Sequence, residues 1–388
     1  MAMNQKTRER IPCLALVGGR VITVSGDTFE GGTVLIGEGK IQAVGESVTI
    51  PAEAEWVDVS GKVVMPGLID AHSHIGLLGE PSVAGNVNHN EMSSPITPEV
   101  RGVDSFNPFD GAFSDALSGG VTAAWTQPGS ANIVGGTGFV AKMWADRPDR
   151  MALPGTEQLA LALGENPVTF SSGAPMTRMG SVMLLRKALR AARAYADSGG
   201  VGDLGLEELA RLVTGQTVAR IHALRADDIL TAIRIAEEFS LTFTIETAVE
   251  GYRVAREIAE AQAPCVLGPF TAPRSKLEYQ HSTPRNAALL HEAGVTLAFQ
   301  CAGASETQWL SVQAGVAVRE GLPEDVALRG LTLTAAELLG VSDRMGSLEV
   351  GKDADIAVFS GHPLDTRSAC ERVFVDGWEA YRREGGRE

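Results

Sequence analysis

Short apolar runs rich in β-branched residues, separated by glycine-containing turns, fill residues 13–64. Runs of this kind are typical of strands, and their close spacing indicates an antiparallel arrangement. Short β-branched runs of the same kind recur near the C-terminus. The two chain ends together therefore predict one small β-sandwich. The predicted strands are 14–17, 21–24, 33–36, 40–44, 56–59, 356–359 and 372–375.

The middle of the chain instead alternates helical patterns with short apolar strands. A helical pattern at 229–238, where Ile229, Leu230, Ile233 and Ala236 recur at helical spacing, is followed by a strand at 241–245. Repeated units of this kind form parallel sheets, and enough of them close a barrel.

We therefore predict an α/β fold, a (β/α)₈ TIM barrel over residues 65–348, with a composite β-sandwich formed by residues 11–64 and 349–385. A doubly wound open sheet is the structural alternative. It is disfavoured because no Gly-x-Gly-x-x-Gly opens a helix after the first strand.

Composition and charge narrow the functional classes. A chain of 388 residues with 44% hydrophobic residues can bury a large core. A formal charge of −15 argues against nucleic acid or an anionic membrane as partner. The partners that remain compatible with this charge are a small-molecule substrate and further copies of the same chain in a homo-oligomer. The four scattered cysteines indicate reduced thiols. With no leader-like or membrane-spanning apolar stretch visible, we expect a cytoplasmic protein.

Two histidines, His72 and His74, follow an apolar run at 63–65 and a Pro-Gly turn. Residues two apart in a strand face the same way, so the two imidazoles suit one divalent ion of the zinc class. A bare His-x-His more often makes ordinary hydrogen bonds. The turn, and Asp70 placed to orient a ligand, favour the metal here.

The segment 66–74 resembles the amidohydrolase superfamily of metal-dependent hydrolases, and other motifs resemble its imidazolonepropionase-related branch. The resemblance covers nearly the whole chain and implies a TIM barrel with its active site at the carboxyl ends of the strands. The motifs occur in the order expected, at 90–98, 120–122, 128–136, 163–167, 177–180, 351–356 and 373–377.

The resemblance also implies a ligand set. It carries metal-binding roles to His72, His74, His222 and Glu165 by position, for one divalent ion that we expect to be zinc. A salt-bridging carboxylate is the other interpretation of Glu165. Arg178 is a candidate for holding a substrate carboxylate by a bidentate pair, and an exposed structural arginine is the alternative.

Three positions depart from the family's pattern. Thr247 stands where strand 6 usually has a histidine, Ala302 where strand 8 has an aspartate, and Ala160 where related chains have a lysine. These losses predict a mononuclear site. The usual aspartate also takes a proton from the attacking water, so Glu165 becomes our candidate catalytic base, with Glu306 as a second carboxylate that could substitute.

The favoured function is a metal-dependent hydrolase that cleaves carbon–nitrogen bonds, in non-peptide or small-peptide amides, with metal-activated water. A catalytically degenerate barrel with a binding or scaffold role is the alternative, and Thr247 and Ala302 support it. A deaminase is the weakest hypothesis, because Arg225 stands where those enzymes generally have a glutamate.

Overall fold

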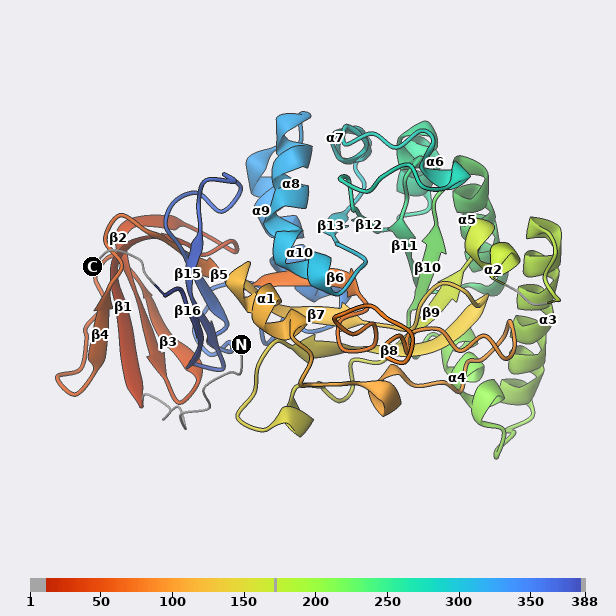
Figure 1. Cartoon of the computed structure of the whole chain (residues 1–388), viewed down its shortest axis with the longest axis horizontal. Helices are drawn as coiled ribbons and strands as arrows, with labels where there is room; N and C mark the ends of the chain where they lie inside the picture. The colour runs from red at the N-terminus through yellow and green to blue at the C-terminus, as the bar shows by residue number, and fades with distance from the viewer. Residues whose placement is uncertain (1–11, 171–172, 385–388) are drawn as a thin grey trace.

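The computed structural model describes residues 12–170 and 173–384, which form a barrel and a β-domain side by side (Figure 1). The outer limits of the predicted sandwich, residues 11 and 385, lie outside the described residues. Both predicted bodies are present, so the predicted fold class is confirmed.

The β-domain is one hydrogen-bonded sheet built from both chain ends, with the order β16-β15-β14-β5-β1-β2-β3 and β4 paired to β1. Its inner face buries apolar side chains from both ends, such as Leu16, Ile36, Val358 and Phe374. Its strands are β1 (Cys13–Ile22), β2 (Thr28–Gly37), β3 (Lys40–Gly45), β4 (Glu55–Asp58), β5 (Val63–Pro66), β14 (Ile356–Phe359), β15 (Cys370–Val375) and β16 (Trp378–Arg382).

The barrel sheet follows chain order, from β6 to β13. One strand departs from the predicted all-parallel arrangement, because β8 runs antiparallel to both β7 and β9. Antiparallel neighbours need no helical crossover, and only loops and one short 3₁₀ turn flank this strand. The strands are β6 (Leu68–Ser73), β7 (Val121–Thr126), β8 (Val134–Lys142), β9 (Gln158–Ala162), β10 (Ala219–Ala223), β11 (Phe243–Thr247), β12 (Cys265–Leu267) and β13 (Leu297–Phe299).

The two edges of this sheet meet through Asp70 of β6. Its fully buried carboxylate accepts hydrogen bonds from the backbone N–H of Cys301, at 3.4 Å, and from the Thr307 hydroxyl, at 3.1 Å. It also accepts from the backbone N–H of His72, at 3.1 Å. Asp70 therefore orients the backbone of the histidine segment and ties it to the chain that follows β13.

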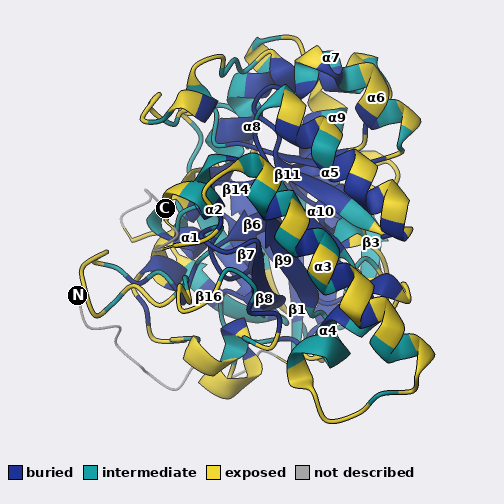
Figure 2. Cartoon of the chain, turned by 90° about the vertical axis from the view of Figure 1, so that its right-hand side faces the viewer, coloured by how far each residue is buried: buried dark blue, intermediate teal, exposed yellow. Residues whose placement is uncertain are grey.

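Helices cover the outside of the barrel and turn their polar faces to solvent (Figure 2). In α5 the predicted inward residues Ile229, Ile233 and Ala236 are buried, whereas Leu230 is 41% exposed and lies off that face. The α-helices are α1 (Ala112–Ser118), α2 (Glu165–Thr169), α3 (Arg178–Asp197), α4 (Leu204–Val213), α5 (Ala226–Phe239), α6 (Ala255–Glu260), α7 (Asn286–Glu292), α8 (Leu310–Arg319), α9 (Glu324–Gly330) and α10 (Leu333–Leu338). The 3₁₀-helices are η1 (Gly102–Ser105), η2 (Pro148–Arg150), η3 (Gly251–Arg253), η4 (Leu277–Tyr279) and η5 (Ser305–Trp309).

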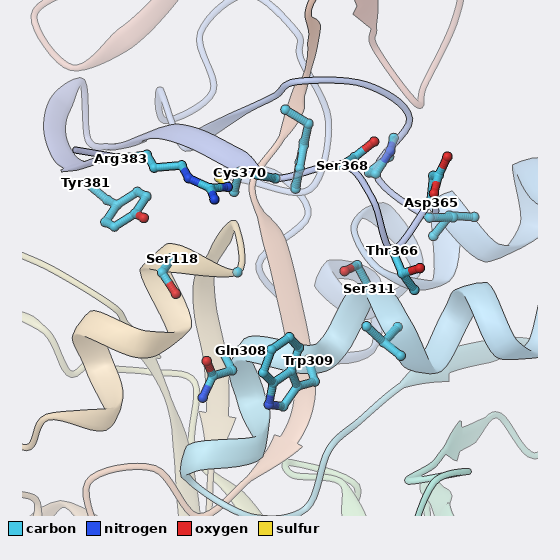
Figure 3. Close-up of a pocket in the computed structure, with 16 residues that line it drawn as sticks. Ser118, Gln308, Trp309, Ser311, Asp365, Thr366, Ser368, Cys370, Tyr381 and Arg383 are labelled. Atoms are coloured by element: carbon cyan, nitrogen blue, oxygen red, sulfur yellow. The ribbon is translucent and has the colours of Figure 1, made fainter. Parts of the chain in front are cut away.

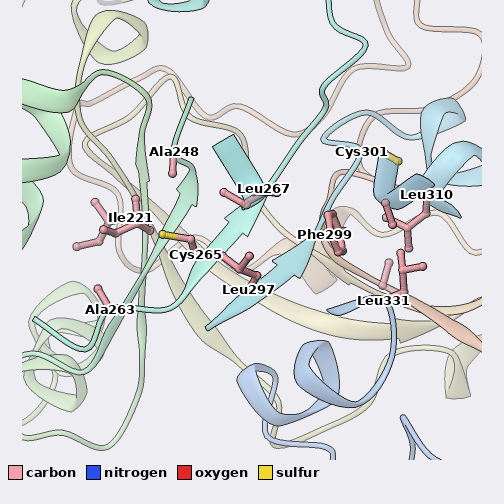
Figure 4. Close-up of a cluster of buried hydrophobic side chains, with 14 of the residues drawn as sticks. Ile221, Ala248, Ala263, Cys265, Leu267, Leu297, Phe299, Cys301, Leu310 and Leu331 are labelled. Atoms are coloured by element: carbon pink, nitrogen blue, oxygen red, sulfur yellow. The ribbon is translucent and has the colours of Figure 1, made fainter. Parts of the chain in front are cut away.

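Two apolar layers support the strands. The outer layer packs side chains such as Ile221, Leu267, Phe299 and Leu310 between the sheet and the helices (Figure 4). The inner layer fills the barrel and includes Trp125 with several alanines. Within the described part of the chain, no helix has the length and apolar character needed to cross a membrane.

Candidate active site

The three predicted histidine ligands lie at the carboxyl ends of barrel strands. His72 is near the end of β6, His74 follows that strand directly, and His222 is near the end of β10. The ring centroids of His72 and His74 are 5.5 Å apart. His222 is close enough for both rings to contribute to its lowered pKa. The structure therefore brings all three imidazoles to the same face of the barrel.

Two of these rings have their Nδ1 atoms engaged. His72 Nδ1 lies 2.9 Å from a carboxylate oxygen of Glu246, and His74 Nδ1 lies 2.8 Å from the carbonyl oxygen of Gln127. Because the Glu246 carboxylate and the Gln127 carbonyl can only accept, they favour the proton on Nδ1 in both rings, which leaves a lone pair on Nε2. The amide nitrogen of Gln127 also lies 2.6 Å from His72 Nδ1. A histidine whose other ring nitrogen donates to a carboxylate or a backbone carbonyl is typical of metal-binding sites.

The third ring, His222, has a weaker contact and an unpartnered nitrogen. Its Nδ1 lies 3.5 Å from the Thr247 hydroxyl, while its Nε2 is buried without a hydrogen-bond partner. Burial and the positive charge of Lys276 lower the pKa of His222 well below its usual range. Burial and the neighbouring His72 and His89 lower the pKa of His74 to about 3. Both rings are therefore neutral at pH 7, which is the form that binds metal.

The donor chemistry fits a zinc-class ion, but the side chains do not enclose one as they stand. Within residues 12–170 and 173–384, no three His, Cys, Asp or Glu side chains are grouped to hold a metal ion. The amide nitrogen of Gln127 lies 2.6 Å from His72 Nε2 and covers the nitrogen that would coordinate. A metal bound by His72, His74 and His222 stays a prediction.

A buried ion pair that the sequence analysis missed lies beneath the histidines. Arg220 of β10 and Glu246 of β11 are both fully buried, with Nε 2.9 Å from Oε1. Arg220 also donates to the Ala71 carbonyl at 2.6 Å and stacks over Trp125 at 4.5 Å. Burial raises the pKa of Glu246, but Arg220 and the hydrogen bond from His72 outweigh it, so the net pKa is lowered.

Glu246 therefore stays ionised and fixes the orientation of the His72 ring. The sequence held one signal for this pair, because each residue is a lone charged position inside a short, otherwise buried strand.

Glu165, the predicted ligand and base, begins α2 after β9. Its backbone N–H donates to the buried carboxylate of Glu278 at 2.6 Å, and its own Oε2 is buried without a partner. No hydrogen bond of the described residues joins its carboxylate to His72, His74 or His222. Its role as ligand or base stays a prediction.

Arg178 lies at the start of α3 and is held by carboxylates of its own chain. Its Nε is 2.9 Å from Asp228, and its Nη2 is 3.3 Å from Glu278. It lines a groove of about 340 Å³ that is bordered by α3 and α5 and includes none of the three histidines. A substrate-binding role for Arg178 stays a prediction.

Two of the three positions where the usual family residues are missing, Thr247 and Ala302, have strained backbones. Thr247, after which β11 ends, has φ 75°, and Ala302, after β13, has φ 66°. Non-glycine residues adopt this left-handed conformation at a cost of about 1–2 kcal/mol each. Ala160, the third departure, packs inside the barrel with apolar neighbours. Strain of this kind clusters at functional sites.

Loops after β6 and β7 meet over the histidines. The ring of His89 lies 5.1 Å from that of His74, and the Gly129 N–H donates to the His89 carbonyl. A side chain at Gly129 would collide with Asn90 and His89, so only glycine permits this approach. The glycine-rich segment thus packs directly against the loop that carries His89.

A separate cleft of about 450 Å³ lies between the barrel and the β-domain (Figure 3). Gln308 and Trp309 line it from the barrel, and Cys370 and Arg383 line it from the β-domain. None of the three histidines contributes to its lining.

Comparison with known proteins places the chain in a family. Residues 63–380 match the family model described as Amidohydrolase family. A crystal structure of an amidohydrolase from Thermotoga maritima MSB8 is 39% identical, covers 95% of this chain and 100% of its own, and superposes with a TM-score of 0.90.

Two curated relatives agree. Imidazolonepropionase from Vibrio cholerae is 27% identical over 401 residues, covering 86% of this chain and 88% of the relative. Amidohydrolase tasK from Hapsidospora irregularis is 29% identical over 386 residues, which are 89% of this chain but only 39% of that longer protein. The chain therefore belongs to the amidohydrolase family, and the imidazolonepropionase-related branch predicted from its motifs is confirmed.

Proposed function

We propose that this amidohydrolase hydrolyses a carbon–nitrogen bond of a small amide, with one divalent ion, zinc in our view, held by His72, His74 and His222. The proposal rests on the hydrogen bonding of the ring nitrogens in these three histidines. His72 and His74 have their Nδ1 atoms engaged by acceptors, and His222 has a buried Nε2 without a partner. Such an ion, when bound, activates water and polarises the scissile carbonyl.

The chain's own residues have distinct parts in this proposal. Glu246, kept ionised by Arg220, holds the proton on His72 Nδ1 and so presents Nε2. The Gln127 amide must move away from His72 Nε2 before that nitrogen can coordinate. Glu165, whose Oε2 is buried and unpartnered, accepts the proton from the attacking water.

Turnover with and without metal tests the proposal. The protein is assayed on cyclic amides, N-acyl amino acids and dipeptides, after chelation and after zinc is restored. We expect activity that chelation removes and zinc restores, and a loss of about 10²–10⁴-fold in Glu165→Gln, which keeps the shape but not the basicity. Full turnover in the chelated protein would refute the metal, and unchanged turnover in Glu165→Gln would refute this base.

A degenerate, non-catalytic barrel is the second candidate, because Thr247 and Ala302 replace the usual histidine and aspartate. Ala302→Asp tests it by restoring the missing carboxylate. Aspartate tolerates the left-handed backbone at this position better than most residues. An inert wild type together with activity in Ala302→Asp would favour the degenerate protein.

A further inference from the structure

The cleft between the barrel and the β-domain is large enough for a small ligand. Its volume of about 450 Å³ is typical of small-molecule sites, which often form where two domains meet. Trp309 of η5 lines it from the barrel, whereas Tyr381 and Arg383 line it from the β-domain (Figure 3). Because none of the three histidines lines this cleft, a ligand bound there would not occupy the proposed active site.

The cleft has a cation without a partner. Arg383 follows β16, and its guanidinium forms no ion pair or hydrogen bond with the rest of residues 12–170 and 173–384. Its neighbour Arg382 is held by Glu379 at 2.6 Å. Burial raises the pKa of Tyr381 and of Cys370, and the positive charge of Arg383 opposes this rise at both groups. The charge of Arg383 therefore acts on the lining of the cleft.

Nearby carboxylates do not balance this charge. Among the described residues that line the cleft, Asp365 is the only acidic one and Arg383 the only basic one. Hydrogen bonds from Arg367 lower the pKa of Asp365 to about 2, so that carboxylate is already paired. Glu371, whose charge also reaches the cleft, pairs with Lys62. The unbalanced charge is positive, and it favours an anion as ligand.

The rest of the lining offers hydroxyl donors beside an apolar wall. The hydroxyls of Ser311, Thr366 and Ser368 form no hydrogen bond with other described residues, so each can donate to an anion. Leu364 and Trp309 belong to the apolar wall, and Trp309 is 56% exposed. An exposed indole at the edge of a cleft presents a flat face on which an aromatic ring can stack.

We propose that this cleft binds a small aromatic anion, with its ring against Trp309 and its carboxylate or phosphate on Arg383. A guanidinium presents a fork of N–H donors that suits either anionic group. The unpaired cation selects the charge of the ligand, and the exposed indole selects its ring. The inference concerns a second site and does not depend on the proposed hydrolysis.

Calorimetric titration of the full chain with four probes tests the inference. Phenyl phosphate and phenylacetate carry a ring and a negative charge, benzyl alcohol carries only the ring, and inorganic phosphate carries only the charge. We expect an aromatic anion to bind at one site per chain with a Kd of about 0.1–1 mM, and the other two probes to bind at least about tenfold more weakly. The tighter of the two aromatic anions identifies the preferred anionic group.

Variants locate the binding at the cleft. Arg383→Met should raise the Kd of the aromatic anion about 10- to 100-fold, and Arg383→Lys should raise it less. Trp309→Ala should raise it about tenfold, whereas Trp309→Phe keeps an aromatic face and most of the affinity. The matched controls are Arg190→Met, which removes an exposed arginine from α3, and Trp56→Ala, which removes an exposed tryptophan from β4. Neither control should change the Kd.

Four results would overturn the inference. The first is that neither aromatic anion binds to the wild type. The second is an unchanged Kd in Arg383→Met, which would place the ligand elsewhere on the molecule. Equal affinity for benzyl alcohol would show that the charge is not recognised, and equal affinity for inorganic phosphate would show the same of the ring. Each of these results leaves the proposed function standing.

Discussion

Glu246 illustrates how much of the site depends on a side chain with no exposed surface. It faces Arg220 on the neighbouring strand, accepts a hydrogen bond from Thr244, and holds His72 through Nδ1. An isolated carboxylate would be neutralised by burial at this depth, so its charge depends on Arg220. The pair therefore fixes the orientation of the His72 ring, whereas a buried ion pair is weak evidence for stability of the fold.

Removing one member of this pair should be costly. We expect Glu246→Gln to lower the free energy of unfolding by about 3–5 kcal/mol, because Arg220 is left as an uncompensated buried charge. The double variant Arg220→Met/Glu246→Gln should recover part of the loss. Urea denaturation of the two single variants and the double variant measures the coupling, and strictly additive losses would contradict an interaction between the two residues.

At the residue level, strand-end position was enough to predict that His72, His74 and His222 share one face. It could not predict Glu246 and Arg220 as a pair, because their contact depends on the register of β10 and β11, in which Arg220 lies opposite Thr244 and His222 opposite Glu246. It also named Arg178 as a candidate for holding a substrate carboxylate. Only the structure shows that Asp228, fifty positions further along the chain, already holds Arg178.

At the level of elements, local pattern predicted most strands and helices, since apolar periodicity follows burial. Leu230 was the exception in α5, where it matches the helical spacing but lies outside the buried stripe. The antiparallel direction of β8 was not predicted. A run of apolar residues predicts a strand but not its direction relative to the neighbouring strands. That direction depends on the segments that connect the strands, which the local pattern does not reveal.

At the level of the whole molecule, a buried lysine joins the two bodies. Lys142 of β8 forms ion pairs with Asp353, Asp355 and Asp376 of the C-terminal segment, at 2.9, 3.1 and 2.5 Å. Burial raises the pKa of Asp355 to about 6. Although burial also acts on Asp353, Lys142 and Lys40 lower its pKa to about 2. The sequence predicted a composite domain from matching ends but not this contact.

Lys142→Met should therefore destabilise the protein in a pH-dependent way. Without the lysine, the buried aspartates repel each other at pH 7.5, and we expect a loss of about 3–5 kcal/mol. The folded pKa of Asp355 is above its usual value and rises further without Lys142. The variant therefore takes up a proton above pH 6, where the wild type does not, and this reduces the deficit as pH falls from 7.5 to about 6.

Urea denaturation at pH 7.5 and pH 5.0 measures this difference, with Lys187→Met as a charge-matched surface control. A deficit that is the same at both pH values would show that the lost packing of the lysine stem, rather than its charge, is responsible.

The central claim is that three histidines of this amidohydrolase hold one metal ion, and metal content tests it most directly. Mass-spectrometric elemental analysis of protein purified without added metal should find about one equivalent of a divalent ion per chain, consistent with a three-histidine site. His222→Ala should lose most of it while remaining folded. Close to two equivalents, or full metal retention in His222→Ala, would contradict the account.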